Sequence, residues 1–127
     1  MCGDFNSPQA ETIKGKVITW GQKILTNGQV VIVNKCRKGN AWNSGERSII
    51  GGLAENDLSD IFRLLNGYKK DEFSWILSRK GRIITRRHFD HIFAFKKLNL
   101  KACHYLYSFR ENRLSDHSAI EGIFVSK

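Results

Sequence analysis

Asp116 and His117 are the residues of this chain best suited to chemistry, because an acid and a histidine stand together just before a short apolar segment. That segment, 119–125, has the composition of a strand, and loops at strand ends hold functional side chains over a rigid scaffold. Consecutive side chains of an extended backbone point in opposite directions. One of the two residues could therefore bind a metal ion while the other faces a substrate.

Two further motifs supply side chains that could complete such a site. The N-terminal run GDFN contributes Asp4 and Asn6, and the run RHFDHIF contributes Asp90. A catalytic histidine needs an acid to hold its tautomer, and Asp90 is the best candidate for orienting His117. Asp4 could bind or deprotonate a water molecule, and Asn6 could donate a hydrogen bond to a phosphate oxygen. Because Mg²⁺ needs only one or two carboxylates besides water and substrate phosphate, the set suits metal-assisted cleavage of a phosphate ester.

Alternating apolar residues and β-branched side chains predict the strands that would carry these groups. The predicted strands cover residues 29–34, 73–78, 82–95, 102–109 and 119–125. Apolar side chains occupy both faces of 82–95, which indicates that this strand is covered on both sides. Asp90 would then be a partly buried acid that needs an arginine, a histidine or a metal as its partner. His88 and His91 would face opposite ways on this strand, which argues against a structural zinc site.

Two helices are predicted between the strands. Apolar residues at steps of three and four predict a helix over 57–66, with Asn56 or Asp57 as its N-cap and Gly67 at its end. A second, looser helical pattern runs over 9–25, where glycine and β-branched residues weaken it.

The stretch 35–52 is rich in glycine and asparagine and is predicted to be a long loop. Trp42 within it would serve either as a satellite core residue or as a lid contact or stacking platform. Tyr105 and Tyr107 would share one strand face, where they could stack on bases or pack in the core.

Composition limits the kind of protein. With 127 residues, of which 41% are hydrophobic and 26% charged, the chain has the make-up of one globular domain. No apolar run approaches the ~20 residues of a membrane span, and the first residues lack the pattern of a signal peptide. Three cysteines at unrelated spacings argue against a disulfide framework. An intracellular location, cytoplasmic or nuclear, is therefore expected.

Positive charge is concentrated in one third of the chain. Residues 79–113 hold ten Lys and Arg against two acids, within a net charge of +9 for the whole chain. Such a basic face is typical of nucleic-acid binders, although a solvated surface that favours solubility would show the same excess. The candidates for nucleic-acid contacts are Arg82, Arg86, Arg87, Lys96 and Lys97.

The motifs and their order resemble those of the endonuclease/exonuclease/phosphatase family, which includes exonuclease III-like repair nucleases, DNase I-like enzymes and retrotransposon endonucleases. GDFN at 3–6, RxxDHIF at 87–93 and SDHS at 115–118 occur in this order, with DIFR and FSW between the first two. The resemblance covers essentially the whole chain, and 35–52 matches least. It implies an α+β fold, namely half of a four-layer α/β sandwich with one mostly antiparallel sheet and one or two packed helices.

The resemblance also implies a role for each matched residue. Asp4 would position or activate the attacking water, and Asn6 would contact the scissile phosphate. Asp90 would hydrogen-bond His117, which would act as a base or stabilise the pentacovalent phosphate. Asp116 would help to hold Mg²⁺ or Mn²⁺.

The chain departs from this family in its length. Members consist of two similar halves packed sheet on sheet, and the first half supplies a metal-binding glutamate and an early asparagine. Residues 1–127 resemble the C-terminal half, and Glu11, Glu46 and Glu55 do not match the missing glutamate. The implied metal site is therefore incomplete, and a homodimer or a complementary half is expected on the exposed sheet face. Arg87 matches the arginine of its motif, which implies a structural role.

Three functions remain open from the sequence. The first is a Mg²⁺-dependent phosphodiesterase, most simply a DNA-cleaving endonuclease or exonuclease that is impaired as an isolated half. The second is a non-catalytic remnant that binds nucleic acid or dimerises. The third is a phosphatase of a small or lipid phosphate, because the same motifs serve that chemistry in the family and inositol phosphates are also polyanions. No membrane partner is expected.

Overall fold

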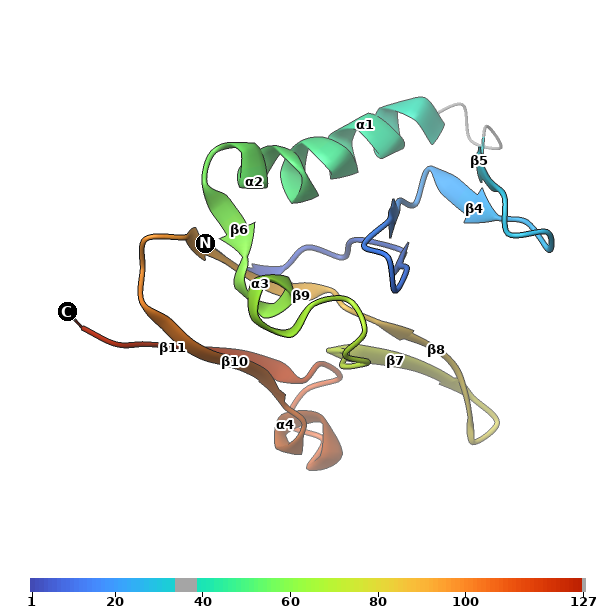
Figure 1. The fold of residues 1–127 in the computed structure, drawn as a ribbon. Helices are drawn as coiled ribbons and strands as arrows, with labels where there is room; N and C mark the ends of the chain where they lie inside the picture. Colours follow the sequence, from blue (N-terminus) through green and yellow to red (C-terminus); the bar gives the residue numbers. More distant parts are fainter. Residues whose placement is uncertain (34–38, 127) are drawn as a thin grey trace.

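The computed structural model describes residues 1–33 and 39–126, which adopt an α+β fold and confirm the predicted class (Figure 1). All strand pairs in these residues are antiparallel. The strands are β1 (Cys2–Asp4), β2 (Ala10–Glu11), β3 (Val17–Ile18), β4 (Gln22–Ile24), β5 (Val30–Ile32), β6 (Leu58–Asp60), β7 (Trp75–Arg79), β8 (Arg82–Arg87), β9 (Asp90–Phe95), β10 (Leu100–Leu106) and β11 (Ala119–Phe124). The helices are α1 (Gly39–Ile50), α2 (Gly52–Glu55), α3 (Ile61–Asn66) and α4 (Ser108–Glu111).

The strand β9 occupies the centre of the fold. It pairs with β1 on one side and with β6 on the other. Figure 1 shows α1 and α2 on one side of these strands, with β10, β11 and α4 on the opposite side. The register places Asp4 of β1 directly opposite Asp90 of β9. The pairing therefore brings the N-terminal motif next to the motif at 87–93.

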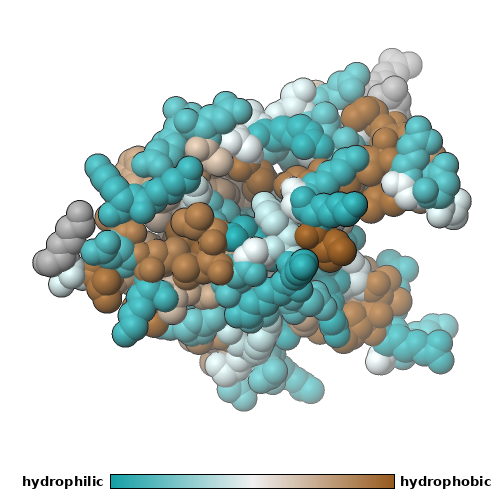
Figure 2. Space-filling model, in the orientation of Figure 1, coloured by the Kyte–Doolittle hydropathy of each residue, from teal (hydrophilic) through white to brown (hydrophobic). Residues whose placement is uncertain are grey.

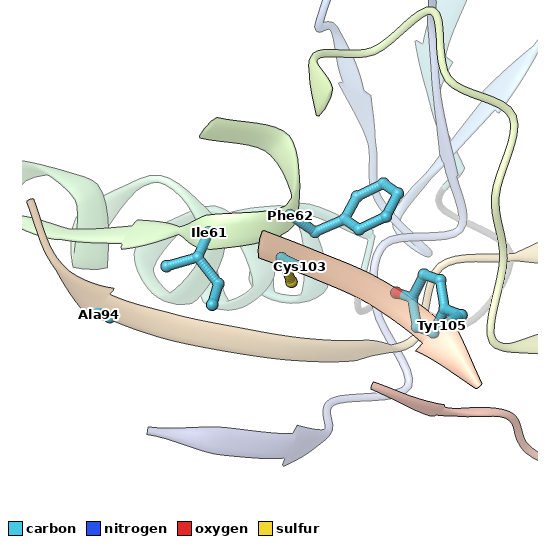
Figure 3. Close-up of a cluster of buried hydrophobic side chains, with 5 residues drawn as sticks. All are labelled: Ile61, Phe62, Ala94, Cys103 and Tyr105. Carbon is cyan, nitrogen blue, oxygen red and sulfur yellow. The ribbon is translucent and has the colours of Figure 1, made fainter. Parts of the chain in front are cut away.

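The hydrophobic core lies between α3, β9 and β10 (Figure 3). Its buried members are Ile61, Phe62, Ala94, Cys103 and Tyr105. The rings of Phe62 and Tyr105 lie 5.2 Å apart between centroids. The hydroxyl of Tyr105 donates a hydrogen bond of 2.7 Å to the carbonyl oxygen of Asp90. Tyr105 is therefore a core residue that also fixes the backbone at Asp90, and it is not available to stack on a base.

The prediction of one long strand over 82–95 is wrong, because the structure divides this stretch into β8 and β9. The hydroxyl oxygen of Ser74 accepts hydrogen bonds from the backbone N–H groups of Phe89 (3.0 Å) and Asp90 (3.1 Å). A side chain thus replaces a strand partner at this point. Beyond the break, β8 pairs with β7, whereas β9 pairs with β1 and β6.

Because of the strand break, the prediction that His88 and His91 face opposite ways is wrong. His88 lies in the break and His91 lies in β9, so the period-two rule does not relate their directions. Their rings stack with centroids 4.4 Å apart, where the sequence predicts that they face opposite ways.

Ser74→Ala is expected to lower the free energy of unfolding by about 1–3 kcal/mol, because two backbone N–H groups would lose their acceptor in a buried place. Urea denaturation would measure the change. Ser78→Ala, at the exposed end of β7, is the matched control and is expected to change stability by less than about 0.5 kcal/mol. Equal effects of the two substitutions would contradict the proposed role of Ser74.

The helix predicted over 57–66 starts later than expected. Its first residues pair with β9 as β6, and α3 begins after Asp60. The carboxylate of Asp60 accepts hydrogen bonds from two backbone N–H groups of the first turn, at 2.9 and 3.3 Å. The predicted N-caps Asn56 and Asp57 are therefore wrong, whereas the end at Gly67 is confirmed. Strand pairing with β9 outweighs the local helical pattern here.

Two predictions for the first half of the chain are also wrong. Residues 9–25 contain β2, β3 and β4 in place of a helix, and most of the predicted loop 35–52 forms α1 and α2. Residues 34–38 lie outside the described residues, and they include the start of that loop and the last residue of the strand predicted over 29–34. Trp42 lies on α1 with 54% of its surface exposed, which excludes the satellite-core interpretation.

Apolar side chains also remain on the surface, where Figure 2 shows them gathered in separate patches. Ile83 and Ile84 of β8 and Ile123 and Phe124 of β11 are each more than a third exposed. The expectation of a homodimer or a complementary half stays a prediction. None of the helices in the described residues is long and apolar enough to cross a membrane.

Candidate active site

Three of the predicted residues meet beside the start of β9. Asp4, Asp90 and His117 each offer a ligand atom that lies within 4.8 Å of the other two. Asp4 and Asp90 come from the paired strands β1 and β9. His117 comes from the segment before β11, where an isolated bridge joins it to Trp75 of β7. The structure thus brings these three residues together as expected, and we call them the Asp–His site.

The contact between His117 and Asp90 defines the chemistry of this site. Nδ1 of His117 lies 2.7 Å from Oδ2 of Asp90, and both side chains are mostly buried. An ionised carboxylate only accepts hydrogen bonds, so the proton on this pair belongs to Nδ1 of the histidine. Nε2 is then free to accept a proton or, when protonated, to donate one. This is the arrangement that an acid–base histidine requires.

Asp4 and Asn6 form a tight unit next to this pair. The backbone N–H of Asn6 donates to Oδ1 of Asp4 at 2.7 Å, and its side-chain Nδ2 donates to Oδ2 at 3.1 Å. Asn6 has a φ of +49°, a left-handed conformation that asparagine tolerates better than most residues. Because an amide nitrogen has two hydrogens, one remains for a phosphate oxygen.

Asp116 lies at the edge of the site. It does not belong to the group of three residues with ligand atoms within 4.8 Å of one another. It does line the same cavity of about 630 Å³ as Asn6 and His117, which we call the Asp–His cavity. Its carboxylate is exposed and has room to take part in binding at that cavity.

The five candidate nucleic-acid contacts do not form one patch. Arg86 and Arg87 end β8, close in sequence to Asp90, whereas Arg82 begins that strand and Lys96 and Lys97 follow the far end of β9. Six residues of strand separate the two ends of β9, which is roughly 20 Å.

Two of these arginines are already held by other side chains. Arg86 forms an ion pair with Asp71 at 3.3 Å. The guanidinium of Arg87 lies 5.8 Å from the ring centroid of Trp20, and burial lowers the pKa of Arg87. The structure is therefore compatible with the structural role that the motif implies for Arg87.

The aromatic lining of the Asp–His cavity consists of Trp20, Trp42, Trp75 and Phe89, and most of it is not predicted from the sequence. The ring of Phe89 lies 6.3 Å from that of Trp20, 5.6 Å from that of Trp75 and 6.4 Å from that of His117. Trp75 belongs to the FSW motif, and this motif could have identified it as a residue of the site. No local pattern marks Trp20.

A second cluster of charged residues lies buried behind the site and consists of Glu11, Asp60, Arg63, His88 and His91, which we call the buried ion cluster. Asp60, His88 and His91 place ligand atoms within 4.8 Å of one another, a spacing that could hold a metal ion. Both ring nitrogens of His91 are occupied, however, at 2.8 Å by Asp60 and at 2.7 Å by the carbonyl oxygen of Ser7. His91 is therefore fully satisfied by protein groups, whereas the buried Nε2 of His88 has no hydrogen-bond partner in the described residues.

The two histidines of this cluster differ in charge. Both partners of His91 are acceptors, so the ring carries a proton on each nitrogen. Burial on its own lowers the pKa of His91, but the hydrogen bond and the charge of Asp60 outweigh burial and raise it. Burial lowers the pKa of His88, and its hydrogen bond to Glu11 offsets this only in part. The folded protein thus holds one charged and one neutral histidine side by side.

The contribution of this pair to the free energy of unfolding is expected to be greatest near about pH 6.5, the ordinary pKa of histidine. Below that pH the unfolded chain protonates both residues but the folded chain protonates only His91, so stability falls as the pH falls. Above it the unfolded chain releases both protons but folded His91 keeps one, so stability falls as the pH rises. Each slope is at most about 1.4 kcal/mol per pH unit.

Urea denaturation at a series of pH values would measure these slopes. His88→Gln is expected to flatten the acidic slope and His91→Gln the alkaline slope. If the free energy of unfolding of the wild type only rises or only falls with pH on both sides of about pH 6.5, the assigned charges are contradicted.

Comparison with protein-family models, with curated proteins and with solved structures finds no match for this chain.

Proposed function

We propose that the Asp–His site hydrolyses phosphodiesters with the help of a divalent metal ion, and that nucleic acid is its substrate. The observation that carries this proposal is the 2.7 Å contact between His117 Nδ1 and Asp90 Oδ2, with Asp4 beside it. The order of the motifs, which resembles that of the endonuclease/exonuclease/phosphatase family, supports the same reaction. The half-sandwich architecture of that family is part of the proposal.

The donor atoms near the site suit Mg²⁺ or Mn²⁺. Asp4 and Asp116 supply exposed carboxylate oxygens, the ligands that hard cations prefer. Among the described residues the site holds a single histidine and no cysteine, so the nitrogen and sulfur ligands that favour zinc are scarce. Asp116 would help to hold the ion, with water and substrate phosphate among the remaining ligands. When bound, the ion neutralises charge on the phosphate and polarises its oxygens.

Side chains of this chain would carry out the remaining steps of the hydrolysis. Asp4 orients a water molecule for attack on phosphorus. As the bond from phosphorus to the leaving oxygen breaks, that oxygen takes up a proton from bulk solvent. Nε2 of His117 accepts the proton of the attacking water or, when already protonated, donates a hydrogen bond to the charged phosphate, in which case the proton of the water passes to Asp4. Asp90 keeps the ring in place and stabilises the imidazolium. The spare hydrogen of the Asn6 amide donates to a phosphate oxygen.

Charge favours a polyanionic substrate. The excess of Lys and Arg within 79–113 raises the local concentration of nucleic acid, and Arg86 and Arg87 lie next to the site in sequence. Small phosphate esters share the reacting group but would gain less from this extended charge.

The test is cleavage of supercoiled plasmid, single-stranded DNA and abasic duplex DNA in the presence of Mg²⁺. We expect nicking that EDTA abolishes and that Asp116→Asn weakens. Salt-sensitive DNA binding without any metal-dependent cleavage would contradict the proposal and favour a non-catalytic binding protein. Turnover of inositol phosphates without cleavage of any nucleic acid would instead favour a phosphatase.

A further inference from the structure

A second, largely apolar cavity of about 550 Å³ adjoins the Asp–His cavity. Phe5, Trp20, Trp42 and Ile49 are among the residues that line it, and we call it the tryptophan cleft. Asn6, Trp20 and Trp42 line both cavities, so the two lie side by side. A molecule with its phosphate at His117 could therefore extend into the tryptophan cleft.

The helix α1 forms one wall of this cleft and is firmly attached. Trp42 and Glu46 lie one helical turn apart and so share a face of α1. The buried carboxylate of Glu46 accepts hydrogen bonds from the hydroxyl of Ser7 at 2.7 Å and from the backbone N–H of Trp20 at 2.6 Å. These bonds tie α1 to the segment that carries the other tryptophan, so the two walls keep their spacing.

The indole of Trp20 is held on several sides. Its Nε1 donates a hydrogen bond of 2.7 Å to the carbonyl oxygen of Asn6. One side of the ring system contacts Phe89, and the guanidinium of Arg87 lies 5.8 Å from the ring centroid. Even so, 44% of Trp20 and 54% of Trp42 remain exposed. Large apolar surface that is positioned but left open indicates a binding surface.

Apart from the Asn6 amide, the polar side chains at the cleft are already used within the protein. Ser7 bonds Glu46, both oxygens of Glu46 are occupied, and the hydroxyl of Ser48 donates to the carbonyl oxygen of Gly45 at 2.8 Å. The cleft thus offers aromatic faces but few groups that could read the hydrogen-bonding edge of a ligand. A flat ring held by stacking is the ligand that fits such a site.

We infer that the tryptophan cleft binds one unpaired nucleobase of the substrate, next to the phosphate that is cleaved. The inference rests on the proposed function for the substrate class and narrows it to nucleic acid that is single-stranded or locally unpaired. A paired base is already stacked in its duplex and would have to leave it in order to enter. Because stacking is tolerant of sequence, the four bases should bind with similar affinity.

Oligonucleotide binding without metal tests this inference. Fluorescence anisotropy in EDTA would compare a labelled oligothymidylate with a strand of equal length that carries tetrahydrofuran in place of its bases. We expect the base-bearing strand to bind about tenfold more tightly, and Trp42→Ala to remove that difference. Equal affinity of the wild-type protein for the two strands would overturn the inference.

Gly45 offers a test that does not risk the fold. A Cβ atom at this lining position would meet no other atom within 4 Å, and replacing a helical glycine favours the helix. Gly45→Phe should fill the cleft and abolish the preference for bases, whereas Gly45→Ala should retain it. A Gly45→Phe protein that still prefers the base-bearing strand would overturn the inference.

The outcomes separate the inference from the proposed function. Base-dependent binding without cleavage in Mg²⁺ would support the inference and contradict the hydrolytic function. If the protein cleaves in Mg²⁺ but wild type and Trp42→Ala each cleave base-bearing and base-free strands at equal rates, the hydrolytic function is supported and the inference is contradicted. If Trp42→Ala changes the sedimentation coefficient but not oligonucleotide affinity, the cleft is an interface between copies of the chain, and the inference fails.

Discussion

His117→Ala is expected to lower the rate of Mg²⁺-dependent phosphodiester hydrolysis by a factor of about 10²–10⁴, the usual contribution of an acid–base group. The substitution removes the only imidazole that the described part of the chain places in the Asp–His cavity. Because Asp90 lies 2.7 Å from Nδ1, the ring is held in one orientation, and no other histidine can take its place.

Asp90→Asn tests the orienting role separately. An asparagine offers an N–H as well as an oxygen to Nδ1, so it no longer enforces the tautomer with its proton on Nδ1. The rate of Mg²⁺-dependent hydrolysis is expected to fall by a similar factor. A rate within a factor of about two of the wild type would contradict the orienting role of Asp90.

His104→Ala is the matched control for both variants. His104 lies 3.1 Å from Glu121 across β10 and β11, so it is also a histidine beside an acid, but both side chains are exposed and outside the cavity. Its removal is expected to leave the rate within a factor of about two, well below the loss for an acid–base group. An equal loss from His104→Ala would contradict the assignment of His117.

Arg63→Ala is expected to lower the free energy of unfolding by about 3–5 kcal/mol, because it leaves the carboxylate of Glu11 buried without its main partner. The side chains of Arg63 and Glu11 are only 10% and 8% exposed. Arg63 also donates to the carbonyl oxygen of Gly67 at 3.1 Å, so the end of α3 loses a contact as well. Urea denaturation at neutral pH would measure the change.

Two further variants establish whether the buried charge is the cause. Removing both charges with Glu11→Gln and Arg63→Met is expected to recover part of the loss, since no unpaired charge is then buried. Asp71→Asn, which breaks the exposed ion pair with Arg86, is expected to cost less than about 1 kcal/mol. A double variant less stable than Arg63→Ala alone would contradict this explanation.

Several features of the site could be predicted from the sequence alone. The α+β class, the end of α3 at Gly67 and the approach of Asp4 and Asp90 to His117 all follow from motifs and local patterns. The reason is that each depends on residue types that act locally, such as a glycine after a helix, or on motifs whose order implies a common site.

The remaining features depend on partners that lie far away along the chain. The hydroxyl of Ser74 accepts the backbone hydrogen bonds at the break between β8 and β9, and the rings of His88 and His91 stack across that break. Neither feature can be predicted from the period of the strand. Hydrogen bonds from Ser7 and Trp20 to the buried carboxylate of Glu46 attach α1 to the segment that carries Trp20.

The sequence by itself therefore determined which residues could do chemistry, because residue type and motif order are local properties. Tertiary structure decided where the strand breaks and that α1, a stretch the sequence predicted to be a loop, forms a wall of the tryptophan cleft. Those outcomes are set by hydrogen bonds and packing between distant segments, which outweigh local propensities of a few tenths of a kcal/mol per residue.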